Sequence, residues 1–135
     1  MCHFLFMLIG IMASADDNNC TKCMCFSVKF QHDLSVKLLE MEPELGPLMQ
    51  KGLETFLTHW LNHVYVFNHS KPGNLALFFC VCFNYLEPTQ ALVSTIINGA
   101  ENYLNTFLKD YTSAKDVEWT SADSSKFDVV FIPRL

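Results

Sequence analysis

Two stretches of alternating residues decide the fold of this chain: MCFSVKF at Met24 to Phe30, and LALFFCVCFNY at Leu75 to Tyr85. In the first stretch every second residue from Met24 is large and apolar, and small or polar residues stand between them. Such alternation is typical of a strand with one buried face. The second stretch alternates in the same way from Leu75 and predicts a longer strand.

One antiparallel register of these two strands satisfies both of their faces. On the core face it pairs Phe30 with Leu75, Val28 with Leu77, Phe26 with Phe79 and Met24 with Val81. On the other face it pairs Cys25 with Cys80 and Cys23 with Cys82. A shift by one residue would turn the apolar side chains away from the core, so the strands are predicted to be neighbours in this register.

Between these strands the period of the apolar residues changes. Gln31 to Pro47 is irregular, because Pro43, Gly46 and Pro47 interrupt it. From Leu48 onward a helical period begins. The apolar positions that follow this period are Met49, Leu53, Phe56, Leu57, Trp60 and Val64. Val64 to Phe67 then reads as a short strand.

The remaining elements complete the fold. Glu87-Pro88-Thr89 is a helix-start signal, and an apolar helical stripe follows it to Leu108. Either Val117 to Trp119 or Phe127 to Ile132 supplies the last strand. We therefore predict an α+β fold of the ferredoxin-like type, β-α-β-β-α-β, with two helices on one face of a four-stranded antiparallel sheet.

The N-terminus has the pattern of a cleaved signal peptide. Phe4 to Met12 is an apolar run, and Ala13-Ser14-Ala15 resembles a cleavage site. We expect residues 1–15 to be removed and residues 16–135 to form a single domain. The longest later apolar run, Leu75 to Phe83, is too short to span a bilayer, so no membrane anchor is expected.

Composition excludes two classes of protein. Half of the 135 residues are hydrophobic and 17% are charged, which is unlike a disordered chain. The formal net charge is −5 and no run of basic residues occurs, which argues against nucleic-acid binding. Two glycosylation sequons, at Asn19 and Asn68, agree with a secretory route and an extracellular location.

The cysteines are predicted to be structural. Loss of the signal leaves five of the six, and an oxidising compartment favours pairing of an even number. The strand register predicts the disulfides Cys25–Cys80 and Cys23–Cys82, although a crossed pairing or a bridge through Cys20 is an alternative. Cys20 is otherwise left over and is a candidate link between two chains.

A thiolate metal site is the rival interpretation of the same cysteines. The spacing C-x2-C-x-C at residues 20–25, with C-x-C at residues 80–82, suits zinc or copper(I). This interpretation gains weight if the signal peptide is not used. With the signal used, we expect neither a metal nor another cofactor.

The order of elements and one stretch of sequence resemble the SEA domain, a β-α-β-β-α-β family found on mucins, proteoglycans and other glycosylated extracellular proteins. In that family the third strand typically opens with Gly-Ser-Val-Val-Val and runs to a Phe, and a Pro-containing segment precedes the second helix. Here Gly73-Asn74-Leu75-Ala76-Leu77 leads through Phe83 to Glu87-Pro88, and Pro43 to Leu57 resembles the approach to the first helix. The resemblance covers residues 24 to 120.

The chain departs from the family at one position. Some members cleave themselves between Gly and Ser, where the Ser hydroxyl attacks the preceding carbonyl. Asn74 occupies that position here and has no hydroxyl group. The resemblance therefore implies a degenerate site at which the bond from Gly73 to Asn74 stays intact.

These observations predict a small secreted glycoprotein whose one SEA-like domain is a non-catalytic extracellular binding or structural module. Its partner would be an extracellular protein or glycan. One alternative is a protease prodomain-like inhibitor that uses the extended tail from Phe127 to Leu135. Another is a secreted helical cytokine, suggested by the two helical stripes. We expect no enzymatic activity.

Overall fold

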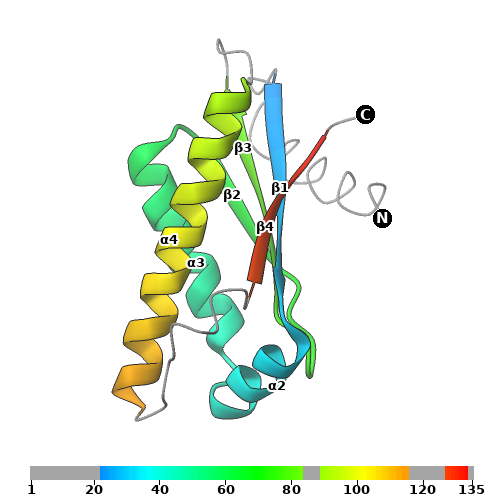
Figure 1. The fold of residues 1–135 in the computed structure, drawn as a ribbon, viewed down its shortest axis with the longest axis vertical. Coiled ribbons are helices and arrows are strands. Elements are labelled where there is room, and N and C mark those ends of the chain that lie inside the picture. The colour runs from blue at the N-terminus through cyan, green and yellow to red at the C-terminus, as the bar shows by residue number, and fades with distance from the viewer. Residues whose placement is uncertain (1–21, 84–88, 116–126, 134–135) are drawn as a thin grey trace.

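The computed structural model describes residues 22–83, 89–115 and 127–133. The described residues form an α+β fold with a four-stranded antiparallel sheet and three helices (Figure 1). The elements in chain order are β1 (Lys22–Phe30), α2 (His32–Met41), α3 (Leu45–Trp60), β2 (Val64–Asn68), β3 (Ala76–Phe83), α4 (Gln90–Ala114) and β4 (Phe127–Ile132). A sheet of this size is inconsistent with the helical-bundle fold on which the cytokine alternative depends.

The predicted pairing of the first and third strands is confirmed. The strand order is β2-β3-β1-β4, so β1 and β3 are the central neighbours. Their register places Phe26 opposite Phe79 and Cys25 opposite Cys80, as the alternation of apolar residues predicts. The predicted partner of Phe30, Leu75, lies one residue before β3 and is fully buried.

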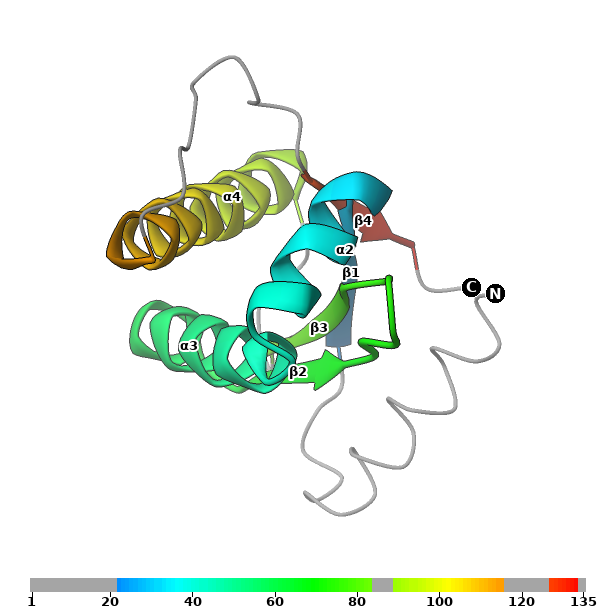
Figure 2. The same cartoon turned by 90° about the horizontal axis from the view of Figure 1, so that it is seen from below.

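The helices α3 and α4 cover one face of the sheet, and Figure 2 shows both on the same side of the strands. α3 packs mainly against β2, and α4 packs against β4. The core lies between these helices and the inner face of the sheet. Its largest fully buried side chains include Met24, Phe26, Leu53, Leu57, Leu77, Phe79, Ile96 and Leu104.

The segment after β1 corrects one prediction, because it is helical and not irregular. α2 spans His32–Met41 and lies at one end of the sheet (Figure 1). Its Leu38 side chain is 1% exposed and belongs to the core. The helix ends at Met41, and the next residue, Glu42, has an extended backbone at φ −149° and ψ 99°. Pro43 explains this end, since a residue that precedes proline is disfavoured in the helical conformation.

The predicted helix over residues 48–64 is confirmed in kind and corrected in its bounds. α3 begins at Leu45, which places Pro47 within its first turn, where a missing N–H group has no consequence. Met49, Leu53 and Leu57 are buried as expected. Two other members of the stripe are exposed, Phe56 at 38% and Trp60 at 44%. They point toward α4 and not into the core.

Two glycines determine how closely α3 and α4 approach each other. The ring of Trp60 lies on Gly99, where an added Cβ would stand 3.1 Å from the ring. Reciprocally, the Tyr103 hydroxyl lies on Gly52, where an added Cβ would collide with it. Tyr103 also stacks on Phe56, with 4.9 Å between the ring centroids. An added side chain at Gly52 would displace the Tyr103 hydroxyl, and one at Gly99 would require the Trp60 ring to shift by a few tenths of an ångström, so both glycines favour close approach of the helices.

The start of α4 and the segment that forms the last strand both agree with predictions from the sequence. The Thr89 side chain caps α4 by accepting a 3.1 Å hydrogen bond from the Leu92 N–H, which confirms the predicted helix start. The segment 127–132 forms β4, an edge strand that pairs with β1. The other predicted fourth strand, Val117 to Trp119, lies outside the described residues. Most of the tail invoked for a protease inhibitor is thus already paired in the sheet.

Candidate functional site

The four predicted cysteines share the outer face of the sheet, opposite the helices. Cys23 and Cys25 alternate along β1, and Cys80 and Cys82 alternate along β3. Cys23 is paired with Cys82, and Cys25 with Cys80, as the strand register predicts. The alternation of the strands thus collects four sulfur atoms on one surface, which we call the cysteine ladder.

The backbone of β3 shows which kind of pair these cysteines form. The Cys82 N–H donates a 3.0 Å hydrogen bond to the carbonyl of His63, on the β2 side. Its backbone groups therefore point away from β1, so Cys82 and Cys23 form a non-hydrogen-bonded pair. The two-residue period gives Cys80 and Cys25 the same geometry. In such pairs the Cα atoms are about 4.5 Å apart, within the range that a disulfide spans.

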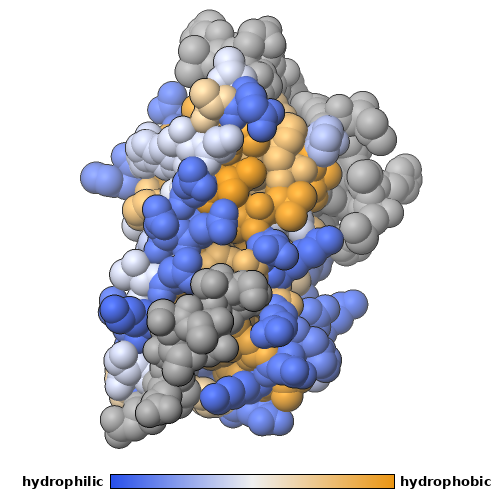
Figure 3. Space-filling model, viewed as in Figure 1, coloured by the Kyte–Doolittle hydropathy of each residue, from blue (hydrophilic) through white to orange (hydrophobic). Residues whose placement is uncertain are grey.

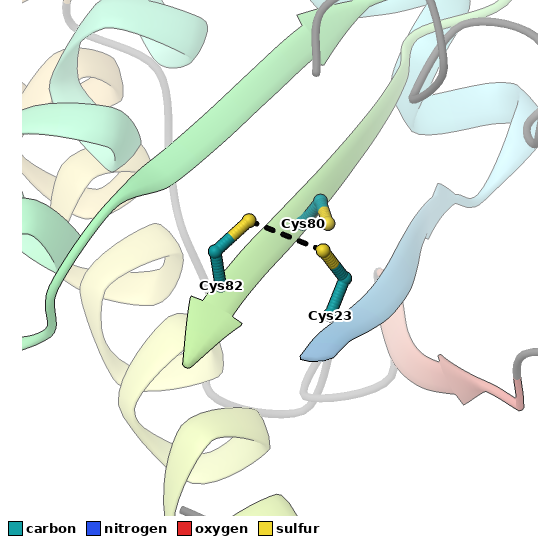
Figure 4. Close-up of side chains that lie close together, drawn as sticks. All are labelled: Cys23, Cys80 and Cys82. Atoms are coloured by element: carbon teal, nitrogen blue, oxygen red, sulfur yellow. Dashed lines mark hydrogen bonds between the residues drawn. The ribbon is translucent and has the colours of Figure 1, made fainter. Parts of the chain in front are cut away.

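The sulfur atoms of both predicted pairs face each other. The Sγ atoms of Cys23 and Cys82 are 3.2 Å apart, and those of Cys25 and Cys80 are 3.9 Å apart. Figure 4 shows the first pair, with the Cys80 sulfur beside it. The structure therefore brings together each pair of predicted partners, and the disulfides themselves remain predictions.

Apolar side chains of the sheet pack against the cysteine ladder. Cys25, Cys80 and Cys82 are each at most 6% exposed, whereas Cys23 is partly buried. Tyr65 from β2, Phe78 from β3 and Ile132 from β4 pack against them. A buried group of sulfurs with apolar neighbours suits cross-linking of the two central strands. It also suits a soft metal ion, since thiolates select such ions.

Three of the four cysteines form a compact triangle. The sulfurs of Cys23, Cys80 and Cys82 all lie within 4.8 Å of one another. Two of these residues are direct partners, and the third reaches them diagonally along β3 (Figure 4). The rival metal-site interpretation placed Cys20 in the same set, but Cys20 lies outside the described residues.

The predicted degenerate cleavage site lies in a tight hairpin turn between β2 and β3. Lys71 and Asn74 exchange two backbone hydrogen bonds of 2.8 Å, which leaves Pro72 and Gly73 at the tip. Gly73 has φ +79°, a left-handed conformation that only glycine adopts at little cost. Proline followed by such a glycine is the pattern of a type II turn.

The predicted glycosylation site, Asn68, ends β2 and is partly buried. Its Oδ1 accepts hydrogen bonds from the Ser70 N–H at 2.9 Å and from the Ser70 hydroxyl at 2.6 Å. Its Nδ2 lies against Gly46 of α3, where an added Cβ would be 2.7 Å away. A glycan on Asn68 therefore requires this side chain to turn away from α3. The other predicted site, Asn19, lies outside the described residues, as does the predicted signal peptide.

Sequence reasoning missed an aromatic depression on the outer side of the helices. It is open, has a volume of about 940 Å³, and is formed by α3 together with Tyr103 of α4. The stacked rings of Phe56 and Tyr103 form part of its wall, beside Lys51 and His59. Phe56 was visible in the sequence as a member of the apolar helical stripe. The stripe alone does not show which of its side chains lie outside the core.

A second apolar surface lies along the edge of the sheet. Figure 3 shows apolar side chains beside α4, over β4 and β1. In β4 the Val130 side chain is 44% exposed, and Phe131 and Ile132 are partly buried.

In the part of the chain that the structure describes, no helix combines the length and the hydropathy needed to cross a bilayer.

Comparison with known proteins identifies no family for this chain. No protein-family model matches it, and no curated protein matches its sequence.

Proposed function

We propose that this chain is a small secreted glycoprotein whose single domain is a non-catalytic extracellular binding or structural module. The cysteine ladder is the observation that carries the proposal. Two facing cysteine pairs in non-hydrogen-bonded positions are poised for disulfides, and disulfides persist in secreted proteins. The predicted signal peptide at residues 1–15 is the independent argument for the same compartment.

The topology supports a ferredoxin-like fold of the SEA type. The strand order β2-β3-β1-β4, with α3 and α4 on one face, is compatible with that arrangement. In this interpretation α2 is an addition between β1 and the first of the two covering helices. The turn at Gly73 and Asn74 joins β2 to β3, where the SEA resemblance expects its cleavage site. Asn74 has no hydroxyl, so the proposed module is not self-cleaving.

Mass spectrometry of the full chain, secreted from eukaryotic cells, tests the proposal. We expect a mature chain that begins near Asp16, is uncut at Gly73, and contains bridges between the peptides of β1 and β3. The mass lost on deglycosylation should become smaller in the variant Asn68→Gln if that sequon is used, and the double variant Asn19→Gln with Asn68→Gln should lose no mass. Retention of the chain in cells, with thiols that alkylate without prior reduction, would contradict the secreted module.

Two double variants distinguish the direct pairing from the crossed one. Cys25→Ser with Cys80→Ser leaves the directly opposed Cys23 and Cys82, and should retain one bridge. Cys25→Ser with Cys82→Ser leaves the diagonal pair Cys23 and Cys80 as the matched control. If the control forms its bridge as completely as the first variant, the direct connectivity is wrong.

A further inference from the structure

We propose that the reduced cysteine ladder binds one copper(I) ion through the thiolates of Cys23, Cys80 and Cys82. The inference concerns the ladder before its cysteines are oxidised, so copper(I) binding and the disulfides proposed above are alternative states of the same residues. It rests on the convergence of three sulfurs from two strands (Figure 4).

The spacing of the sulfurs matches a three-coordinate ion. Metal–thiolate bonds are about 2.3 Å long, so a planar trigonal site needs sulfurs about 4 Å apart. The Sγ atoms of Cys23 and Cys82 are 3.2 Å apart, and all three sulfurs lie within 4.8 Å of one another. The separations in the structure therefore differ from those of a planar trigonal site by less than about 1 Å.

The donor set and its surroundings favour a soft ion. All three ligands are sulfurs, and thiolates select copper(I) over harder ions. Cys80 and Cys82 are nearly inaccessible, and Tyr65, Phe78 and Ile132 pack around them. Such walls limit access of water, which is the usual competing ligand.

The number of ligands favours copper(I) over zinc. Zinc in structural sites is almost always bound by four ligands in a tetrahedron. The fourth ladder cysteine, Cys25, has its sulfur 3.9 Å from that of Cys80 but is not a member of the compact group. A site of three sulfurs is complete for a trigonal copper(I) ion and incomplete for zinc.

Binding must release protons. Each thiol that becomes a ligand gives its proton to the solvent, so one copper(I) ion displaces up to three protons from the reduced chain. The affinity should therefore rise with pH. A weakly buffered solution with a pH indicator measures this release directly, and it does not depend on any biological activity of the protein.

Competition for copper(I) tests the proposal. The full chain is reduced, freed of reductant without oxygen, and titrated into the coloured complex of copper(I) with bathocuproine disulfonate. Decolourisation reports capture of the ion by the protein, and we expect one equivalent per chain. The same titration in a chain carrying Cys2→Ser and Cys20→Ser removes the thiols outside the ladder and should give the same stoichiometry.

Single variants locate the ligands. Cys80→Ser should weaken binding at least tenfold, whereas Cys25→Ser should change it less than threefold. Cys25 is the matched control, because it is buried in the same cluster and receives the same substitution. Cys23→Ser repeats the test at a partly buried ligand, where loss of folding is less of a concern.

Three results would overturn the proposal. One is failure of the reduced chain to compete for copper(I). Another is an equal loss of affinity in Cys25→Ser and Cys80→Ser. The third is tighter binding of one zinc ion than of copper(I), with Cys25 required, which would indicate a four-sulfur zinc site. None of them depends on secretion or glycosylation, so failure here is distinguishable from failure of the extracellular module.

Discussion

The two faces of the sheet are both buried at their centres, but by different means. On the inner face Phe26 and Phe79 stack with 4.8 Å between their ring centroids, under α3 and α4. On the outer face the neighbouring positions are Cys25 and Cys80, against which Tyr65, Phe78 and Ile132 of the sheet pack. One register of β1 and β3 creates both faces, because successive residues of a strand point to opposite sides.

The difference between the faces lies in how they stabilise the fold. The inner face gains free energy by removing large apolar groups from water, which acts in every redox condition. The outer face contains small sulfur groups, and their contribution to the unfolding free energy depends on whether they form disulfides with each other. The faces should therefore respond differently to truncation and to reductant, and the predictions below exploit that contrast.

The largest effect is expected at the centre of the inner face. Phe26→Ala removes a side chain that is fully buried and contacts both Phe79 and Phe131. Loss of such a ring costs about 3–5 kcal/mol of unfolding free energy. Urea denaturation measures it, and the cost should be the same with and without reductant. Lys29→Ala, at an exposed position of the same strand, is the control and should change little.

The next effect belongs to the outer face and should depend on redox state. Replacing Cys25 and Cys80 together by Ala should lower the unfolding free energy of the oxidised protein by about 2–4 kcal/mol. With reductant present, the difference from the unsubstituted chain should shrink to the small loss of packing. Equal stability of the unsubstituted chain in oxidising and reducing urea titrations would contradict cross-linking of this face.

A smaller effect concerns the contact between the helices that cover the inner face. Gly52→Ala places a methyl group against the Tyr103 hydroxyl, which opposes the gain of about 1 kcal/mol in helix propensity. In a Tyr103→Phe background the hydroxyl is gone, so the same substitution should be more favourable. A double-mutant cycle in thermal unfolding should give a coupling of about 1 kcal/mol. Additive effects would show that the hydroxyl does not limit helix approach.

The smallest effect lies at the charged rim of the inner layer. Partial burial, together with the charge of Asp128, raises the pKa of Glu101. The folded state then binds this proton more tightly than the unfolded state, so stability is lost as pH rises above the ordinary carboxyl pKa. Glu101→Gln should therefore be slightly more stable than the unsubstituted chain at pH 7, by less than about 0.5 kcal/mol. Denaturation at pH 3.5 should abolish the difference, and a constant difference across pH would refute the assignment.

Much of the sheet was predictable because the alternation of buried and outward-facing residues on one strand must match that on its partner strand. The alternation of Met24, Phe26 and Val28 matches that of Leu77, Phe79 and Val81 in the observed register, and a shift by one residue would destroy the match. The same register also places Cys25 opposite Cys80 and Cys23 opposite Cys82. The start of α4 was predictable for a similar reason, since the Thr89 cap is a local interaction between residues three apart.

The α2 helix was not predictable with the same ease. It has ten residues, no side-chain cap at its first turn, and few apolar positions that reach the core. Leu34 and Leu38 are spaced for one helix face, but Pro43, Gly46 and Pro47 follow closely and suggest a loop. Burial of Leu38 against the core is a tertiary contact that stabilises the helix, and a short helix depends on such contacts.

By itself the sequence determined the α+β class, the pairing of β1 with β3, and the facing of the cysteine pairs, because these follow from a period of two along the chain. Only the tertiary structure decided that Phe56 and Trp60 pack against α4, that Asn68 lies on Gly46, and that Cys80 approaches both Cys23 and Cys82. Those contacts depend on how closely helices and strands approach and on which rotamers fit between them. No local pattern of residues encodes such distances.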